Sequence, residues 1–382
     1  MTVVWSIPTR VLFGEGALTE LGDEARRLGA SSALLVADHE GPPGEDVARV
    51  LERAGVPATA APPVPANPRA AAVHAAADAY REAHADLVVA VGGSGAMNAG
   101  KLVRLAVSHG LPLAEYDEAQ GGTAKVTQPM PPMAALPTAG AGQEVTPRTL
   151  LTLDDRPGRV AIEAPALMPD VAILDPALAS GLDPRSTAAR GVETLAIQVE
   201  AYCAKADHPV ADALALHGLE LLAKHLRTAV EDGSDLRARG GLQKAALMAG
   251  VASGKGLGAS HALAHPLSAA SGIEPGEAAA LCLPAVLDFN RAAATFRIAR
   301  VARLLGVKGT DLDTLAFECS GKVRALRRDL GLDRDSVDLE SLPDPAVLAA
   351  EAYADAAHRT NPRACTRDDL QTLLKASLDE PA

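Results

Sequence analysis

Short apolar runs alternate with helical patterns through the first half of the chain. Mainly aliphatic runs of four or five residues occupy Ala33–Ala37, Leu87–Val91, Met133–Leu136 and Val171–Leu174. Continuous runs of this length are typical of buried parallel strands. Between them, 44–55 and 68–84 carry apolar residues at helical spacing. Strands that alternate with helices predict a doubly wound parallel sheet with helices on both faces.

From about residue 180 onward, strand signals stop and helical patterns follow one another. The predicted helices cover 184–205, 209–232, 234–256, 275–293, 294–305, 310–330, 344–358 and 366–378. Three of them begin after a residue that favours the helix N-cap, namely Asp183, Asp344 and Thr366. We therefore predict an α/β domain over residues 1–180 and an all-helical domain over residues 181–382.

Composition and charge narrow the class of protein. The chain has 382 residues, 48% hydrophobic and 22% charged, as in a folded globular protein. Its net charge of −12 argues against a nucleic-acid binder, which would need a basic face for phosphates. No apolar run approaches the ~18 residues of a membrane helix, and the N-terminus lacks a signal-peptide pattern. We expect a cytoplasmic protein that acts on a small molecule, with no nucleic-acid or membrane partner.

Cysteines and aromatic residues are few. The 4 cysteines lie far apart with no CxxC pair, which argues against a structural zinc site or a disulfide framework and favours a reducing compartment. Aromatic residues make up only 2% of the chain, so the core must be packed mostly from Ala, Leu and Val.

A glycine-rich stretch directly follows the second predicted strand. Residues 91–101 read VGGSGAMNAGK and lead into a predicted helix. Glycines let the backbone approach a ligand closely, and the free N–H groups of a first helical turn attract phosphate. The stretch has neither the GxGxxG nor the Walker spacing, so a tight turn without a ligand is the alternative to a phosphate site.

Two further features lie at predicted strand ends. Residues 136–146, LPTAGAGQEVT, run into small residues and hydroxyls, with Thr138 and Thr146 able to form hydrogen bonds. Asp38 follows the first predicted strand, where a carboxylate can accept hydrogen bonds from the ribose hydroxyls of a nucleotide. A plain turn is the alternative for the first feature, and a helix cap or a solvated loop acid for the second.

Two histidines stand four residues apart, His261 and His265 in the stretch HALAHP. On a helix this spacing puts both on one face, so both side chains can reach one point. The arrangement suits a metal or an acid–base pair, and two half-buried histidines with satisfied hydrogen bonds are the alternative.

Together these stretches resemble the iron-containing alcohol dehydrogenase superfamily, which includes maleylacetate reductase and has a dehydroquinate synthase-like fold. The resemblance runs from about Thr9 to about Leu374. Further matching stretches follow in the family's order: RVLFGEGA at 10–17, PDVAILDP at 169–176, EAY at 200–202, DALAL at 212–216, HALAHPL at 261–267 and NPR at 361–363. The spacing from Pro137 to Thr146 is nearer to maleylacetate reductase than to the longer alcohol dehydrogenase version. A homodimer is the family's expectation.

The resemblance implies a nicotinamide cofactor held between a dinucleotide-binding α/β domain and a helical domain. It assigns to the cofactor Asp38, Gly92, Gly93, Ser94, Gly95, Asn98, Thr138, Thr146 and Arg159. The glycine turn would hold the pyrophosphate, the two threonines would lie beside the nicotinamide, and Arg159 stands where the family has a Lys near the cofactor. Asp38 would face the adenosine ribose and favour NAD(H) over NADP(H), because a carboxylate repels a 2′-phosphate. In the family motif, close to GGGSxxDxxK, Asn98 replaces the Asp and Lys101 is kept.

The family's metal site is altered in this sequence. The resemblance places its ligands, one Asp and three His, at Glu193, Ile197, His261 and Pro275. Ile and Pro have no donor atom, and the two remaining candidates are too few for a three-ligand catalytic metal. We therefore predict that no metal is bound. Recruitment of Glu274 or Glu277 as a ligand is the alternative.

Without a metal, a protonated histidine can stabilise the substrate oxygen and supply the proton. His261 and His265 are the candidates, and Glu193 either orients one of them or raises its pKa, or has no role. The main hypothesis is a metal-independent NAD(P)H-dependent oxidoreductase that reduces a carbonyl, an enone or an imine of a small organic substrate. The alternatives are a non-redox lyase, dehydratase or cyclase on the same scaffold, for example in secondary metabolism, and a binding pseudoenzyme that keeps only the fold.

Overall fold

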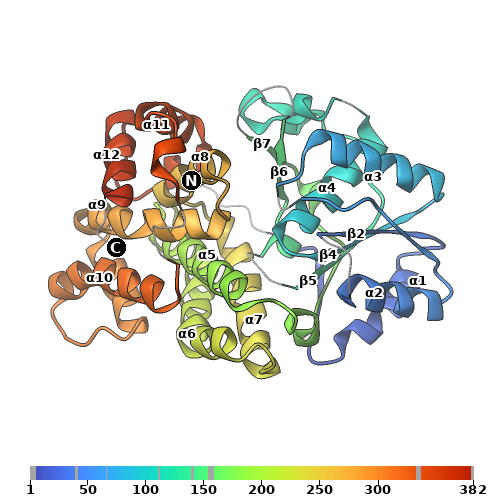
Figure 1. Ribbon diagram of the computed structural model, residues 1–382, viewed down its shortest axis with the longest axis horizontal. Coiled ribbons are helices and arrows are strands. Elements are labelled where there is room, and N and C mark those ends of the chain that lie inside the picture. The colour runs from blue at the N-terminus through green and yellow to red at the C-terminus, as the bar shows by residue number, and fades with distance from the viewer. Residues whose placement is uncertain are drawn as a thin grey trace. The chain divides into compact units, whose positions relative to one another are not determined.

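The computed structural model describes residues 6–38, 42–65, 67–110, 112–138, 142–153, 159–332 and 337–379 (Figure 1). These form two compact units, Ser6–Leu182 and the residues from Asp183 onward. Among the described helices, none combines the length and apolar character needed to cross a membrane.

The first unit is built on a parallel sheet of 6 strands in the order β1-β8-β5-β4-β2-β3. The strands are β1 (Arg10–Phe13), β2 (Ala33–Ala37), β3 (Ala58–Ala60), β4 (Leu87–Gly92), β5 (Met133–Pro137) and β8 (Val171–Leu174). All its strand pairs are parallel. The four strands predicted from apolar runs are confirmed, as is the α/β class.

Alternate residues of the strands face two different helical layers. Ala33 and Leu35 belong to a core with α1 (Leu21–Arg27) and α2 (Pro42–Arg53). Leu34 and Val36 belong to another with α3 (Ala70–Glu82) and α4 (Ser94–His109). Figure 1 shows the two pairs of helices on opposite sides of the sheet, so the sheet is doubly wound as predicted.

The order in which the chain adds strands to this sheet changes direction next to β2. From β2 the chain passes to the edge strand β3 and then returns to β4 on the other side of β2. The carboxyl ends of β2 and β4 thus flank a topological switch point, where open α/β sheets commonly bind ligands.

The sequence patterns missed the small hairpin of β6 (Arg148–Thr152) and β7 (Arg159–Glu163), which pair antiparallel. Both strands alternate between buried and half-buried residues. Such strands contain no continuous apolar run, so the sequence pattern did not predict them. Strands β1 and β3 were missed for a related reason, because most of their residues are exposed.

The second unit is helical in its described part. Its helices are α5 (Pro184–Cys203), α6 (Pro209–Glu231), α7 (Leu236–Ser253), α8 (Ala259–Ser271), α9 (Pro275–Leu304), α10 (Leu312–Asp329), α11 (Pro345–Ala354) and α12 (Arg367–Leu378). The predicted caps are confirmed: the Asp183 and Asp344 side chains accept backbone N–H bonds, and Thr366 forms a capping box with Asp369. The two helices predicted at 275–293 and 294–305 form one element with a kink at Ala294.

One predicted helix was too long. The pattern over 344–358 predicted a single helix, but α11 ends at Ala354 because Asp355 is extended (φ −68°, ψ 133°). The Asp355 carboxylate instead accepts the N–H of Ala357, which opens a 3₁₀ turn. This break allows Asp355 to reach a histidine on α8.

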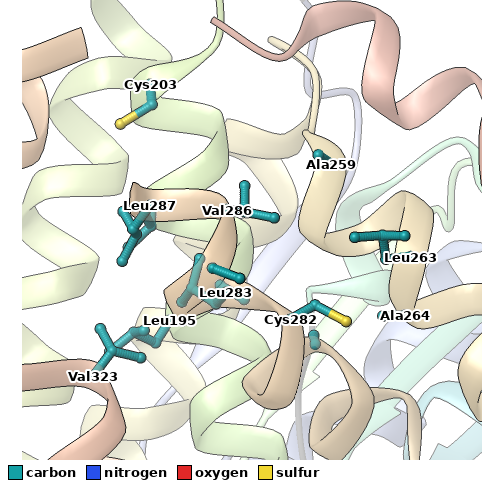
Figure 2. Close-up of a cluster of buried hydrophobic side chains, with 14 of the residues drawn as sticks. Leu195, Cys203, Ala259, Leu263, Ala264, Cys282, Leu283, Val286, Leu287 and Val323 are labelled. Carbon is teal, nitrogen blue, oxygen red and sulfur yellow. The ribbon is translucent and has the colours of Figure 1, made fainter. Parts of the chain in front are cut away.

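The helical unit is packed around aliphatic side chains, as its low aromatic content requires. Figure 2 shows members of this cluster from four helices: Leu195 of α5, Leu263 of α8, Leu283 and Leu287 of α9, and Val323 of α10. The two histidines of α8 and the acidic residues of α5 are therefore carried by helices that a common core holds together.

Candidate functional site

The glycine-rich turn lies at the switch point of the sheet. Gly92 ends β4 with φ +144°, a backbone conformation that favours glycine, and α4 begins two residues later. A Cβ on Gly92 would lie 2.5 Å from Oδ2 of Asp38, so glycine is also required by space.

Asp38 caps α4 from the end of the neighbouring strand β2. Its carboxylate accepts the backbone N–H groups of Gly93 and Ala96. Of the sequence alternatives for Asp38, the structure therefore shows a cap, although on a helix distant in sequence. It also shows that the first turn of α4 binds an anion, as the unpaired N–H groups and the dipole of a helix N-terminus favour. Backbone donors of this kind fit a dinucleotide pyrophosphate.

Thr138 and Asn98 flank this turn. The N–H of Thr138 donates to the carbonyl of Gly92 at 3.0 Å, which brings the end of β5 to the turn. Asn98, one turn into α4, is buried; its carbonyl accepts from Thr149, and its side-chain Oδ1 has no hydrogen-bond partner among the described residues.

Thr146 lies in a different environment, around Lys101 of α4. The buried Lys101 Nζ donates to four oxygens at 2.7 to 3.1 Å: the carbonyls of Gln143, Thr146 and Arg148 and the hydroxyl of Thr146. Burial lowers the pKa of Lys101 to about 7, and burial also raises the pKa of the adjacent Glu144 to about 7. Hydrogen bonds from Lys101 thus hold segment 143–148 against α4.

Arg159 is not brought to this segment. It begins β7 opposite Thr152, at the far end of the hairpin from Arg148. Four steps along a strand separate those ends, about 14 Å at 3.4 Å per residue. Residues 139–141, which belong to the predicted nicotinamide loop, lie outside the described residues.

In the helical unit, His261 is paired with Glu200. His261 lies near the start of α8 and its Nδ1 bonds Oε2 of Glu200 on α5. The other oxygen of Glu200 accepts the N–H of Ser260 at 2.6 Å. A Cβ on Gly258 would lie 2.6 Å from that same oxygen, so glycine allows the close approach of α8 to Glu200.

This pairing controls the protonation of His261. Burial disfavours the charged ring, but the negative charge and hydrogen bond of Glu200 outweigh it, so the pKa of His261 is raised. The second ring nitrogen, Nε2, is buried and has no hydrogen-bond partner among the described residues.

His265 lies one turn further along α8, as predicted, with its ring centroid 6.2 Å from that of His261. Its Nδ1 lies 2.6 Å from Oδ2 of Asp355. Each histidine therefore has its own carboxylate, which binds Nδ1 and orients the ring.

Glu193 lies beside this pair but is held by an arginine. Nη1 of Arg190 donates to Glu193 at 3.3 Å, and Nη2 of Arg190 lies 3.1 Å from Oε2 of Glu274. Glu193 is also among the negative charges that raise the pKa of His261. Glu277 is paired elsewhere, with Arg185 at 2.7 Å.

These residues do not fit the family's metal ion. In the described part of the chain, no three His, Cys, Asp or Glu side chains are grouped so that they could hold a metal. Ile197 and Pro275 offer no donor, and Glu193 and Glu274 are both engaged by Arg190.

Sequence reasoning missed three residues of this site: Glu200, Asp355 and Arg190. A signal existed for Glu200, since it stands seven residues after Glu193 and two helical turns put both on one face of α5. Asp355 gave no such signal, because the break after Ala354 that brings it to His265 was not predicted.

Comparison with known proteins identifies the family. Residues 8–176 match the family described as iron-containing alcohol dehydrogenase, and residues 187–378 match the Fe-containing alcohol dehydrogenase family, C-terminal. The NAD-dependent methanol dehydrogenase of Bacillus methanolicus is 31% identical over 381 residues, 97% of this chain and 99% of that protein. The chain belongs to the iron-containing alcohol dehydrogenase family, as the sequence resemblance predicted.

Solved structures agree. A crystal structure of 1,3-propanediol oxidoreductase superposes with a TM-score of 0.93 at 30% identity, covering 99% of this chain and 100% of that one. Sulfoacetaldehyde reductase from Bifidobacterium kashiwanohense, in complex with NAD⁺, gives 0.85 at 27% identity, with 100% of both chains covered. The chain is thus an enzyme of the dehydrogenase and reductase class, an oxidoreductase of small organic substrates.

Proposed function

We propose that this oxidoreductase is NAD(H)-dependent and metal-independent, and that it reduces a carbonyl, enone or imine with His261 as proton donor. The observation that carries the proposal is the geometry of His261. Its Nδ1 is bound by Glu200, while the buried Nε2 has no hydrogen-bond partner among the described residues. Buried polar atoms are rarely left unpaired, so a substrate oxygen is a fitting acceptor for this N–H.

The choice of NAD(H) has two supports. One relative is named an NAD-dependent dehydrogenase, and another was solved with NAD⁺. In this chain, Asp38 stands against the first turn of α4, where it would oppose the additional 2′-phosphate of NADP(H). The turn over Gly92–Gly95 would receive the pyrophosphate, and Asp38 would exchange its backbone partners for the ribose hydroxyls.

When held at the turn over Gly92–Gly95, a reduced nicotinamide dinucleotide would supply the hydride for the carbon of the substrate's C=O group. Protonated His261 donates its Nε2 proton to the oxygen, so that a C–H and an O–H bond form and an alcohol results. Glu200 stabilises the charged ring before the transfer and keeps its Nδ1 bond to the neutral ring afterwards. His265, held by Asp355, is the alternative donor on the same face of α8.

The first test is a titration of chelator-treated protein with NADH, followed by nicotinamide fluorescence and calorimetry. We expect micromolar binding that added metal does not improve, and turnover of a carbonyl substrate that survives the chelator. Activity that disappears with the chelator and returns with iron or zinc would overturn metal independence. Conversion of substrate without a change in nicotinamide absorbance would favour the non-redox enzyme.

The second test removes the proton donor. His261→Gln should lower kcat by about 100- to 10,000-fold, the usual range for a general acid, with NADH affinity unchanged. His217→Gln is the matched control, because His217 is an exposed residue paired with Glu220 on its own helix. Full turnover in His261→Gln would refute the assignment, and a loss shared by His265→Gln would show that both rings act.

Two finer features rest on the family resemblance. The short spacing from Pro137 to Thr146 supports a branch near maleylacetate reductase, which turnover of maleylacetate with NADH would test. A homodimer is expected, and sedimentation equilibrium at micromolar concentration would reveal a monomer if that expectation is wrong.

A further inference from the structure

Arg190 joins two carboxylates from different parts of the helical unit. Its guanidinium bonds Glu193, one turn along α5, and forms an ion pair with Glu274, the residue before α9. Only 12% of the Arg190 side chain is exposed. The position of a mostly buried cation between two acids is set by the fold rather than by chance contact at a flexible surface.

Close packing keeps the two acids within reach of the arginine. Gly276, in the first turn of α9, has no room for a side chain: a Cβ there would lie 2.4 Å from the carbonyl oxygen of Ala189 and 3.0 Å from Cβ of Glu193. The start of α9 therefore rests directly on the turn of α5 that carries Arg190. Glu274 is held beside Glu193 by this contact.

The positions of these acids matter because of the family's metal. Glu193 stands at one of the four ligand positions that the resemblance assigns, and Glu274 directly precedes another, Pro275. The neutral ligands have been lost at Ile197 and Pro275, but negative charge remains on both sides of the site. Among the described residues, the cation that lies between these two acids is the guanidinium of Arg190. Burial raises the pKa of Glu274, and the charge of Arg190 partly offsets that rise.

We infer that Arg190 takes the electrostatic place of the metal ion, neutralising Glu193 and Glu274 and excluding divalent cations from the site. This inference rests on the metal-independent function proposed above. A guanidinium suits the task, because it stays charged at any pH the protein survives and can bind two carboxylates at once. A second positive charge brought close to it is repelled.

The test distinguishes two causes of weak metal binding: the missing ligand at Ile197 and the positive charge of Arg190. Ile197→His restores one nitrogen donor on α5, one turn after Glu193 and on the same face. In this background we compare Arg190 with Arg190→Met, which keeps the length of the side chain and removes the charge. Chelator-treated full-length protein is titrated with Co²⁺, followed by its visible absorption, and with Zn²⁺ by calorimetry.

We expect Ile197→His alone to bind Co²⁺ weakly and Ile197→His/Arg190→Met to bind one Co²⁺ per chain more tightly, on the order of 100-fold. Arg190→Lys in the same background keeps the positive charge, so its Co²⁺ affinity should be as weak as that of Ile197→His alone. Arg185→Met is the matched control, since Arg185 also joins α5 to α9 through an acid, Glu277. It should not change the affinity.

Equal Co²⁺ affinity in folded proteins with Arg190 and with Arg190→Met would overturn the inference. Tight stoichiometric Co²⁺ binding by the unchanged protein would also overturn it. The same holds if Arg190→Lys raises the Co²⁺ affinity as much as Arg190→Met does. None of these readouts uses NADH or turnover, so their failure is distinguishable from failure of the His261→Gln test. Circular dichroism establishes that each variant is folded, and Arg190→Gln replaces Arg190→Met if the latter is not.

Discussion

The candidate sites of the two units use different chemical groups, backbone N–H groups in the first and side chains in the second. At the switch point of the sheet, the groups that bind an anion are backbone N–H groups of Gly93 and Ala96, presented by a helix N-terminus. In the helical unit, the candidate site consists of side chains that pair with one another: His261 with Glu200, and Arg190 with Glu193. The first site depends on the path of the backbone, which requires glycine at Gly92, whereas the second depends on the side chains that its helices carry.

The family resemblance shows the same contrast. Around the glycine turn, Asn98 replaces an Asp and the glycine order differs, yet the turn still ends β4 and opens α4. At two of the positions to which the resemblance assigns metal ligands, Ile197 and Pro275 have no side-chain donor atom. Beside these positions the structure has a guanidinium between two acids and two histidine–carboxylate pairs.

The largest stability effect we expect comes from Lys101, where side chain and backbone meet. Lys101→Met leaves up to four oxygens without their donor, three of them backbone carbonyls of segment 143–148. Unsatisfied buried groups cost about 1–3 kcal/mol each, so we expect a loss of at least about 3 kcal/mol in the free energy of unfolding. Urea unfolding measures it.

Lys125→Met is the control for this prediction. Lys125 is exposed and paired with Glu115 at 3.3 Å, so its loss should change stability by less than about 0.5 kcal/mol. Equal stability of Lys101→Met and the unchanged protein would mean that segment 143–148 is held by other contacts. Lys101 would then not be the side chain that holds the backbone of this segment against α4.

The fold could be predicted further than the site. Strand β2 matches its predicted range to the residue, because a buried parallel strand leaves a continuous apolar run. The hairpin β6–β7 could not be found in this way, because half of each strand is only partly covered. Helix caps at Asp183 and Asp344 were visible because a cap acts on residues two or three positions away.

The contacts that define the site were less visible because they join distant residues. The bond of Asp38 to the first turn of α4 spans 55 positions, and that of His265 to Asp355 spans 90. Sequence spacing showed that His261 and His265 share a face, but it could not show which carboxylate each ring meets. Such pairings depend on helix packing, which a single sequence does not reveal.

The next effect in size concerns the charge pair of the helical site. Glu200→Gln removes the carboxylate that raises the pKa of His261, so burial then lowers it. In the unchanged protein the pair stabilises the fold fully below the ordinary pKa of about 6.5 and loses this effect as pH rises through the raised value. We expect Glu200→Gln to cost about 2 kcal/mol at pH 6 and less at higher pH, measured by urea unfolding across pH.

The same variant tests the role of His261 in turnover. If protonated His261 donates the proton, the alkaline limb of the kcat profile should move to lower pH in Glu200→Gln. Glu220→Gln, which removes the partner of the exposed His217, is the control and should leave both profiles unchanged. A stability loss without any shift of the kcat profile would assign Glu200 to structure alone.

The smallest effect is the difference between two glycine variants, one inside the glycine turn and one outside it. Gly92 and Gly29 both have positive φ, +144° and +78°, but an added Cβ meets Asp38 at Gly92 and open space at Gly29. Gly29→Ala should cost about 1 kcal/mol from backbone strain, and Gly92→Ala about 1 kcal/mol more, because Asp38 must leave the turn. NADH titration should show weaker binding in Gly92→Ala and none of this weakening in Gly29→Ala. Equal NADH affinity in both variants would mean that the path of the backbone at Gly92 does not matter to the cofactor, and the contrast between the two sites would no longer hold.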